Sequence, residues 1–370
     1  MIAGPFAGQA LAEMGADVVK VESPSGDPAR QIGPHQGERS LYFSAVNTGK
    51  RGVMLDSRTA EGRARLQDLI SASDIVIENF RPAAAAALSV TPSELLERYP
   101  MLVIVSICGY SRKTGRGEEA AYDVSVQAEA GIMSVTGEPG REPVRAGVPI
   151  SDLAAGLYGA LGAVGGLVSR YVTGNGRHVE VPLLDATLPL LSYMATSTVF
   201  TGSEPGKVGS GHHSIVPYGA FPTTDGWIVI AVLSDRFWEP LCDALGLAEL
   251  RTRAELTENR GRLAARDDVE AAVATATSQL TLDQASELLQ VADVPHAPVN
   301  DLLEALDSAY VRQRGMVAQV RTPEGGYASV QGPLHAATSP RPAPLLGEHT
   351  DEVLREWSQA RFNLTPTEAP

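Results

Sequence analysis

One carboxylate, Asp152, stands at the start of a long run of apolar and small side chains, "PISDLAAGLYGALGAVGGL" (149–167). An aspartate is a preferred N-cap, because its side chain accepts hydrogen bonds from the first free N–H groups of a helix, which is worth ~1 kcal/mol. Ser151 is a second candidate for the same cap. A charged group at this place is therefore a helix cap, a reactive carboxylate, or both.

Other motifs that carry chemistry are missing from the chain. Gly4 and Gly8 with Pro5 between them do not make the G-x-G-x-x-G of a dinucleotide site, and no strand precedes them. Glu22, at the end of an expected strand, is more often a solvated charge than a ribose ligand. There is also no P-loop, H-E-x-x-H or G-x-S-x-G. The sequence does not predict an oxidoreductase, an NTPase, a zinc protease or an α/β-hydrolase.

The composition is that of an ordinary globular protein with about two domains. Of the 370 residues, 44% are apolar and 20% are charged, and a chain of this length buries a large core. The formal net charge of −14 repels phosphate, so we expect no nucleic-acid partner. The longest apolar run, 153–168, is shorter than the ~20 residues of a membrane span, so we expect no membrane partner.

The two cysteines, Cys108 and Cys242, form neither a disulfide framework nor a metal-ligand spacing. This usage predicts a reducing cytoplasm and no metal site. No cationic and apolar leader opens the sequence, which also favours a cytoplasmic location.

Apolar strands that alternate with helices predict a mostly parallel α/β sheet over the first half of the chain. The chain opens with a loop, a short helix that ends at Gly15, and a strand around 18–21. Further strands are expected at 51–56, 74–80 and 101–110, and helices at 59–71, 91–98 and 153–171. The stretch 178–186 is expected to add a strand and to start another helix.

The pattern changes near residue 214. Two strands around a Thr-Asp-Gly turn are expected in 217–232, followed by helices at 235–245, 266–279 and 281–291, a hairpin at 315–333 and a closing helix at 349–357. We therefore expect a large α/β domain (1–186), a linker (187–214), a smaller α+β domain (215–312), a linker with a hairpin (313–348) and a C-terminal helical segment (349–370).

Nine stretches, taken together, resemble the class III CoA-transferases, the group of formyl-CoA and carnitine CoA-transferases and α-methylacyl-CoA racemase. They occur in the same order as in the family and extend over nearly the whole chain. Nine motifs in this order indicate the family far more specifically than any single motif does. The stretches are "AGPFAGQALAEMGADVVKVE", "GDPAR", "NTGKRGVMLD", "SDIVIENFRP", "AAYDVSVQAEAG", "RAGVPISDLAAG", "TGNGRHVEVPLLDA", "VPHAPVNDLLEAL" and "PLLGEHTDEVL".

The resemblance implies a Rossmann-like large domain built from both chain ends, a small domain, and two subunits threaded through one another as an interlocked homodimer. In the family pattern a further strand precedes the turn at Gly4, and this sequence does not contain it. We therefore expect an unpaired edge or a gap in the sheet. A truncated paralogue that binds CoA without turnover is one alternative that this departure leaves open.

By resemblance, Asp152 matches the catalytic aspartate of the family. The implied function is the transfer of CoA from an acyl-CoA thioester to a carboxylic acid, through an aspartyl mixed anhydride and an aspartyl-CoA thioester. An ionised carboxylate can attack a thioester carbonyl, and we expect the helix N-terminus to keep this one charged. The implied partners are an acyl-CoA, a carboxylic acid and a second copy of the chain, with no permanently bound cofactor and CoA thioester as substrate.

The racemase branch of the family pairs the same aspartate with a His directly before an Asp. Here that pair is Tyr122-Asp123, and a Tyr with a pKa near ~10 is a poor proton shuttle at neutral pH. We therefore favour transfer over racemisation, which stays the second reading. Tyr122 is expected to contact the pantetheine arm or the acyl carbonyl, and core packing is its alternative.

The resemblance also implies a CoA site. The matching positions are Ile2, Ala3, Leu55, Arg58, Asn79, Phe80 and Arg81. Arg58 and Arg81 are the expected phosphate partners, because a guanidinium binds phosphate with two hydrogen bonds; a solvated surface Arg is the alternative. Two basic contacts usual in the family are absent, at Ser23 and Ala120. Two alternatives follow: weaker affinity for CoA, or compensation by Lys20, Lys50 or Arg112.

Overall fold

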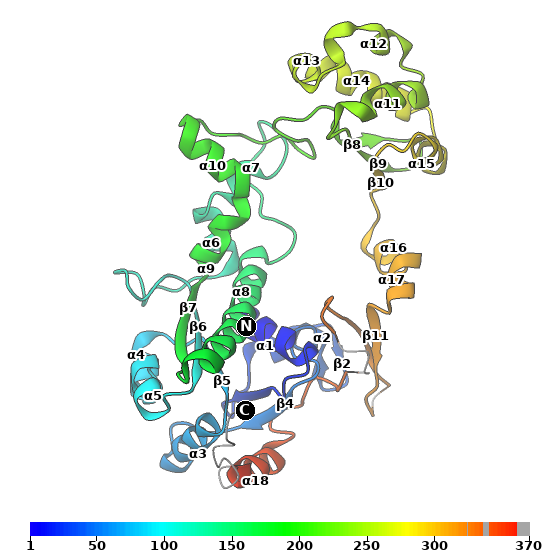
Figure 1. Ribbon diagram of the computed structural model, residues 1–370. Helices are drawn as coiled ribbons and strands as arrows, with labels where there is room; N and C mark the ends of the chain where they lie inside the picture. The colour runs from blue at the N-terminus through cyan, green and yellow to red at the C-terminus, as the bar shows by residue number, and fades with distance from the viewer. Residues whose placement is uncertain (324, 336–339, 361–370) are drawn as a thin grey trace. The chain divides into compact units, whose positions relative to one another are not determined.

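The computed structural model describes residues 1–323, 325–335 and 340–360, and the chain divides into two compact units (Figure 1). The first unit consists of Met1–Ala130, Ala146–Ala195 and Ala309–Pro370, and the second of Gly131–Arg145 and Thr196–Ser308. The first unit thus combines both ends of the chain. Part of the expected C-terminal segment, 361–370, lies outside the described residues.

The first unit contains parallel strands in two separate sheets. One pairs β1 (Val19–Glu22) with β4 (Arg51–Met54), and the other has the order β5 (Ile75–Glu78), β6 (Val103–Cys108), β7 (Arg177–Pro182). Every residue of β6 is buried, as expected of a parallel strand that is covered on both faces. The chain is therefore α/β with parallel pairing, but the single continuous sheet expected from the sequence is divided.

The helices of the first unit cover these strands. Thr59 caps α3 (Ala60–Ser71), and Thr91 with Glu94 forms a capping box on α5 (Pro92–Arg98), as the sequence pattern predicts. The first helix, α1, begins at Ala3, where the sequence suggested a loop. The unit also contains η1 (Pro28–Gln31), α2 (Leu41–Ser44), α4 (Pro82–Ala87), α6 (Asp123–Glu129), α8 (Ile150–Thr173), α9 (Leu183–Thr187) and α18 (Thr350–Ala360), with short strands β2 (His35–Gln36) and β3 (Arg39–Ser40).

Helix α8 packs closely because its buried face carries Gly and Ala. A Cβ at Gly156 would lie 2.8 Å from the Ala3 carbonyl oxygen of α1, and a Cβ at Gly166 would lie 2.4 Å from Val103 Cγ1 of β6. Both separations are shorter than any normal contact of a Cβ atom, so a larger residue at either position forces its neighbour to shift. The Gly-rich run therefore fixes the start of α8 against the start of α1.

The adjacent glycines Gly165 and Gly166 allow a matched test of this packing. Gly165 is exposed and has open space where a Cβ would be, whereas Gly166 is buried against Val103. We expect Gly165→Ala to change the free energy of unfolding by less than ~1 kcal/mol, because a Cβ there meets open space within the chain. Gly166→Ala should lower it by ~1–3 kcal/mol through overpacking. Urea denaturation of both variants measures the difference, and equal effects would contradict this packing.

The second unit is an α+β structure. Its strands β8 (Tyr218–Pro222), β9 (Trp227–Ala231) and β10 (His296–Pro298) form an antiparallel sheet in the order β10-β9-β8. Its main helices are α11 (Trp238–Leu245), α14 (Arg266–Thr277) and α15 (Leu282–Val291). The shorter ones are α7 (Ile132–Val135), η3 (Asp235–Phe237), α12 (Ala248–Thr252), η4 (Ala254–Leu256), α13 (Asn259–Ala264) and α16 (Leu302–Leu306).

The expected linkers contain regular structure. Residues 187–214 include η2 (Leu188–Leu191) and α10 (Ser192–Thr201), because a run of Ser and Thr still permits a helix where apolar residues recur. Residues 313–348 begin within α17 (Ala309–Arg314). They contain the expected hairpin, in which β11 (Val317–Val320) pairs antiparallel with β12 (Tyr327–Val330).

The C-terminal helix α18 is attached to the strands of the first unit through a buried arginine. Arg51 of β4 forms ion pairs with Asp17, Glu352 and Glu356, the last at 2.6 Å. Val353 of α18 is fully buried beside Val53 and Leu69. Residues from the two ends of the sequence therefore build one core.

Candidate active site

Asp152 does not cap its own helix. Helix α8 begins at Ile150 and Pro149 is its N-cap residue, so Asp152 is the third residue of the first turn. The cap comes from another helix: Asp123 Oδ1, at the start of α6, accepts the backbone N–H groups of Ser151 at 2.8 Å and Asp152 at 3.2 Å. The capping role expected for Asp152 is thus wrong, and its carboxylate is left available.

The Asp123 carboxylate is fixed on both of its oxygens. Its Oδ2 accepts a hydrogen bond of 2.6 Å from Gln127 Nε2, one turn further along α6. Gln127 is fully buried, and its Oε1 accepts the N–H of Ala146 at 2.8 Å. Asp123 and Gln127 therefore connect α6 to the segment 146–152, which contains the first turn of α8. These hydrogen bonds fix the direction in which α8 begins.

The environment of Asp152 raises its pKa. Burial of the half-buried carboxyl and, after it, the negative charge of Asp123 raise the pKa from 3.8 to about 6. This is opposite to the direction expected from the helix N-terminus alone, because desolvation disfavours the charged form. Above pH 6 the group is mostly ionised, and it is a more basic carboxylate than an ordinary aspartate.

A tyrosine that the sequence analysis did not select shares this environment. Burial and, next, the negative charge of Asp152 raise the pKa of the Tyr42 hydroxyl, and Asp27 and Asp123 act in the same direction. Tyr42 lies on the short helix α2, far from Asp152 in the sequence. Neither its type nor its spacing distinguishes it from other tyrosines, so only the fold could reveal it.

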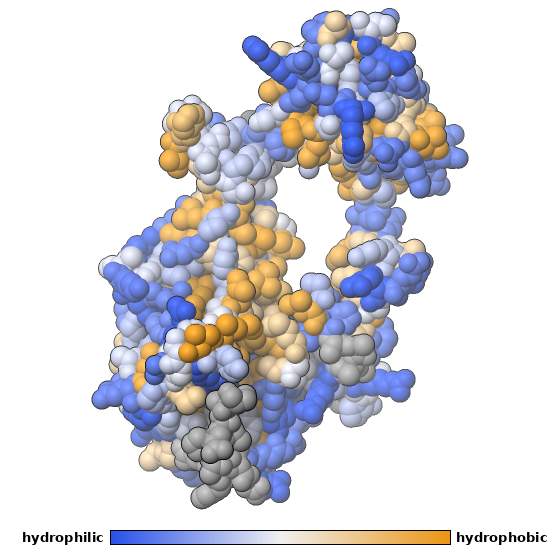
Figure 2. Space-filling model, viewed as in Figure 1, coloured by the Kyte–Doolittle hydropathy of each residue, from blue (hydrophilic) through white to orange (hydrophobic). Residues whose placement is uncertain are grey.

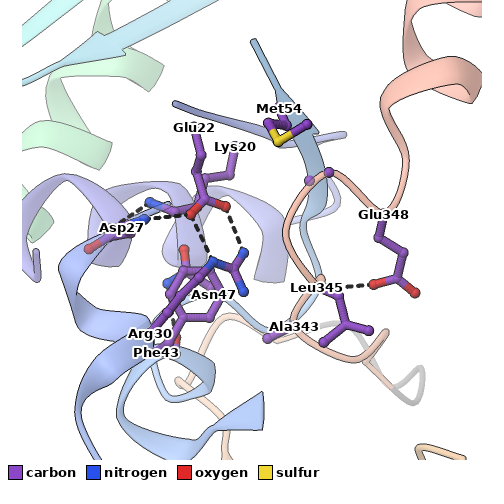
Figure 3. A network of polar contacts seen from close by, with 12 residues as sticks. Lys20, Glu22, Asp27, Arg30, Phe43, Asn47, Met54, Ala343, Leu345 and Glu348 are labelled. Atoms are coloured by element: carbon purple, nitrogen blue, oxygen red, sulfur yellow. Dashed lines mark hydrogen bonds and ion pairs between the residues drawn. The ribbon is translucent and has the colours of Figure 1, made fainter. Parts of the chain in front are cut away.

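The segment after β1 is held by two ion pairs (Figure 3). Arg30 donates to both carboxylate oxygens of Glu22, at 2.8 and 2.6 Å, and Lys20 contacts Asp27 at 2.8 Å. The Arg30 guanidinium also lies 3.8 Å from the ring centre of Phe43. Glu22 is therefore a buried structural carboxylate, which agrees with the absence of a dinucleotide fingerprint.

The first pair of expected CoA residues lies at the start of α1. Ile2 is the N-cap residue of the helix and is half-buried, whereas Ala3 is buried. The Ala3 carbonyl faces Gly156, one turn beyond Asp152 on α8. The fold therefore brings Ile2 and Ala3 to the first turns of the helix that carries Asp152.

The second pair of expected CoA residues, Leu55 and Arg58, follows β4. One side chain is buried and the other is exposed. Leu55 is buried in a core cluster with Val53 and Leu69, so its side chain faces inward. Arg58 is exposed, and its Nε contacts Asp56 Oδ1 at 2.8 Å in a two-point ion pair. An exposed pair of this kind is weak in water, so Arg58 can exchange Asp56 for another anion at small cost.

The remaining expected CoA residues follow β5 and precede α6. Asn79 donates its side-chain N–H to the Ile107 carbonyl, Phe80 is 39% exposed, and Arg81 is exposed at the start of α4. Tyr122 is 70% exposed immediately before Asp123. The core-packing alternative for Tyr122 is therefore wrong, and its ring is open to a ligand.

The three cations expected to replace the missing CoA contacts have partners inside the protein. Lys20 pairs with Asp27, and Arg112 pairs with Glu78 at 2.8 Å. Lys50 is buried, and burial lowers its pKa well below the usual range. Its Nζ lies within 2.9 Å of three oxygens, those of the Pro5 and Val46 carbonyls and the Asn47 side chain. All three oxygens belong to the chain itself, so Lys50 serves the fold.

Two further features bear on the expected partners. Among the described residues, no group of three or more His, Cys, Asp or Glu side chains could hold a metal ion. Helix α8 is long and apolar enough, by length and composition, to cross a membrane, and 44% of its most apolar stretch is buried in the chain. A core helix meets the same criteria, so this is weak evidence for a span.

Comparison with known proteins assigns this architecture to a family. Residues 1–350 match the model of CoA-transferase family III. The succinate–glutarate CoA-transferase of Agrobacterium fabrum is 33% identical over 99% of this chain and 95% of that protein. The acetyl-CoA:oxalate CoA-transferase of Acetobacter aceti is 32% identical over 96% of this chain and 92% of its own.

A solved structure shows the same fold. A CaiB/BaiF family protein from Brucella suis superposes with a TM-score of 0.85 at 33% identity, covering 96% of each chain. The chain therefore belongs to CoA-transferase family III. It is a CoA-transferase that moves CoA between an acyl-CoA thioester and a carboxylic acid, as the sequence resemblance predicted.

Proposed function

We propose that Asp152 is the nucleophile of the transfer. An Asp152 oxygen attacks the thioester carbonyl, the carbon–sulfur bond breaks, and CoA thiolate leaves from a mixed anhydride. The thiolate then attacks the aspartyl carbonyl, which releases the first carboxylate and leaves an aspartyl-CoA thioester. A carboxylate oxygen of the second acid attacks the aspartyl carbonyl, the carbon–sulfur bond breaks, and CoA thiolate leaves from a second mixed anhydride. The thiolate then attacks the acyl carbonyl of the second acid, which forms the new acyl-CoA and releases the Asp152 carboxylate.

The observation that carries this proposal is the position of Asp152 in the first turn of α8, half-buried and facing the charge of Asp123. A carboxylate with a pKa of about 6 is ionised at neutral pH and more nucleophilic than one at 3.8. Because Asp123 already binds the first N–H groups of α8, the Asp152 oxygens are not tied to its own helix.

The proposed CoA site comprises residues at the start of α1, residues that follow β4 and β5, and the residue that precedes α6. It consists of Ile2, Ala3, Leu55, Arg58, Asn79, Phe80, Arg81 and Tyr122. The exposure of Arg58, Arg81, Phe80 and Tyr122 supports a surface that takes phosphates and an adenine. Small dicarboxylic acids are the first acceptors to test, because relatives are named for glutarate and oxalate.

We further propose a Rossmann-like large domain, a cytoplasmic location and a homodimer. Orange, apolar residues gather along α8 in Figure 2. Those of its residues that stay exposed in one chain are Leu157, Tyr158, Leu161, Val168, Tyr171 and Val172. An apolar face of this extent on one helix is typical of a protein interface, and a second copy of the chain is the proposed occupant. Sedimentation velocity tests this state.

An exchange assay separates transfer from racemisation. The protein is incubated with succinyl-CoA and unlabelled glutarate, and mass spectrometry follows the formation of glutaryl-CoA. The proposal predicts a new thioester only when an acceptor acid is present. Incorporation of solvent deuterium at Cα of a 2-methylacyl-CoA without any acceptor would instead support the racemase. CoA binding without either reaction across a panel of acids would support the paralogue without turnover.

A further inference from the structure

The peptide of Phe80 is held at both ends by one buried ion pair. Glu78 Oε2 accepts the Phe80 N–H at 2.7 Å, and Arg112 Nη2 donates to the Phe80 carbonyl at 2.8 Å. The same Arg112 Nη2 donates to Glu78 Oε1 at 2.8 Å. The carboxylate and the guanidinium thus enclose the backbone of a residue in the proposed CoA site.

This pair is anchored to all three strands of the β5-β6-β7 sheet. The side chains of Glu78 and Arg112 are only 3% and 14% exposed. Arg112 Nη1 donates to Ser106 Oγ of β6 at 3.1 Å, and the Arg112 N–H donates to Glu180 Oε1 of β7 at 2.7 Å. Ser106 Oγ also contacts His178 Nε2 at 2.8 Å. A network with this many partners leaves the Phe80 backbone little freedom.

The backbone of Phe80 is held by hydrogen bonds, whereas the residue is partly exposed to solvent. The residue is 39% exposed although it follows a strand of the sheet core. An aromatic ring on a fixed backbone is a stacking surface for a nucleobase, and such stacking contributes ~1–3 kcal/mol per base. A ring held in place before binding loses less entropy when the ligand arrives.

We propose that Glu78 and Arg112 are positioning residues that hold Phe80 as a stacking platform for the adenine of CoA. This inference rests on the proposed function of the site. Neither residue contacts CoA in this scheme; both act through the Phe80 backbone. Loss of the pair therefore weakens only the nucleotide half of the ligand.

Calorimetric titration of the full chain with CoA and with 4′-phosphopantetheine tests this inference. Phe80→Leu and Arg112→Lys should each weaken CoA binding by about 10-fold, within the range of one lost stacking contact, and leave 4′-phosphopantetheine binding unchanged. Lys keeps the charge but cannot reach Glu78, Ser106 and the Phe80 carbonyl together. The double variant should weaken CoA binding no more than either single variant.

Arg116→Lys is the matched control, because Arg116 lies four residues away and its ion pairs are with two exposed acids, Glu119 and Glu129. Its guanidinium also lies 3.6 Å from the ring centre of Tyr110. This control variant should change neither affinity. If Arg112→Lys does not fold, Glu78→Gln replaces it: the Gln oxygen still accepts from Arg112, but its amide nitrogen cannot accept the Phe80 N–H. This variant should weaken CoA binding and leave 4′-phosphopantetheine binding unchanged. Equal weakening of both ligands, additive single effects, or unchanged CoA affinity in Phe80→Leu would each overturn the inference. These are binding measurements, so they stand apart from failure of the Asp152 chemistry.

Discussion

Asp152→Asn is expected to abolish CoA exchange, lowering kcat by at least ~10⁴-fold, because an amide cannot form the anhydride. Steady-state transfer from succinyl-CoA to glutarate measures the loss. Asp283→Asn is the matched control, since Asp283 is also an acid in the first turn of a helix but lies in the second unit. That variant should transfer CoA at the wild-type rate.

The same substitution should not weaken the fold. The pKa of Asp152 is about 6 in the folded chain and 3.8 otherwise. Between these pH values the folded chain binds the proton more tightly, so the free energy of unfolding falls as the pH rises through this window. Asp152→Asn removes the charge and should be at least as stable as the wild type at pH 8. An inactive but unfolded variant would leave the chemical assignment without support.

The second large effect on activity is expected from substitution of Asp123. Two variants separate the effect of its negative charge from the effect of its hydrogen bonds to α8. In Asp123→Asn an oxygen still accepts the N–H groups of Ser151 and Asp152, but the negative charge is gone. The pKa of Asp152 should fall, so the acid limb of kcat/KM, expected near pH 6 in the wild type, should move to lower pH. The pH profile of exchange measures this shift.

Asp123→Ala removes the acceptor as well. Two N–H groups at the start of α8 lose their partner, which should lower the free energy of unfolding by ~1–3 kcal/mol. Displacement of Asp152 should also lower kcat by about 10²-fold. In Asp123→Asn the new amide nitrogen faces Gln127 Nε2, so that hydrogen bond is lost. Adding Gln127→Glu supplies an acceptor at position 127 and restores the hydrogen bond.

An unchanged acid limb of the pH profile in Asp123→Asn would show that Asp123 does not set the pKa of Asp152.

Much of the fold follows from local pattern. Strands β5 and β6 are short runs rich in Val and Ile, and the caps of α3 and α5 are Thr residues with the expected partners. These features depend on neighbours in the sequence, so periodicity and capping rules find them. The division of the parallel strands into two sheets depends instead on pairing between distant segments.

The sequence predicts a site residue where its type and its position before a helix are both informative. It does not predict residues whose role depends on contacts between distant segments. Asp152 is a lone acid before an apolar helix, so it is conspicuous in the sequence. The cap from Asp123 and the contribution of Tyr42 are set by the fold alone. The direction of the pKa shift of Asp152 was missed for the same reason, since desolvation depends on burial that no local pattern reveals.

The most direct measurement is a search for the acylated enzyme. The protein is mixed with an acyl-CoA, quenched with hydroxylamine and digested, and the peptide that contains Asp152 is analysed by mass spectrometry. The account predicts a hydroxamate at Asp152 that forms only with acyl-CoA and is absent from Asp152→Asn. Full exchange activity with an unmodified peptide at this position, in hydroxylamine and in borohydride, would contradict it.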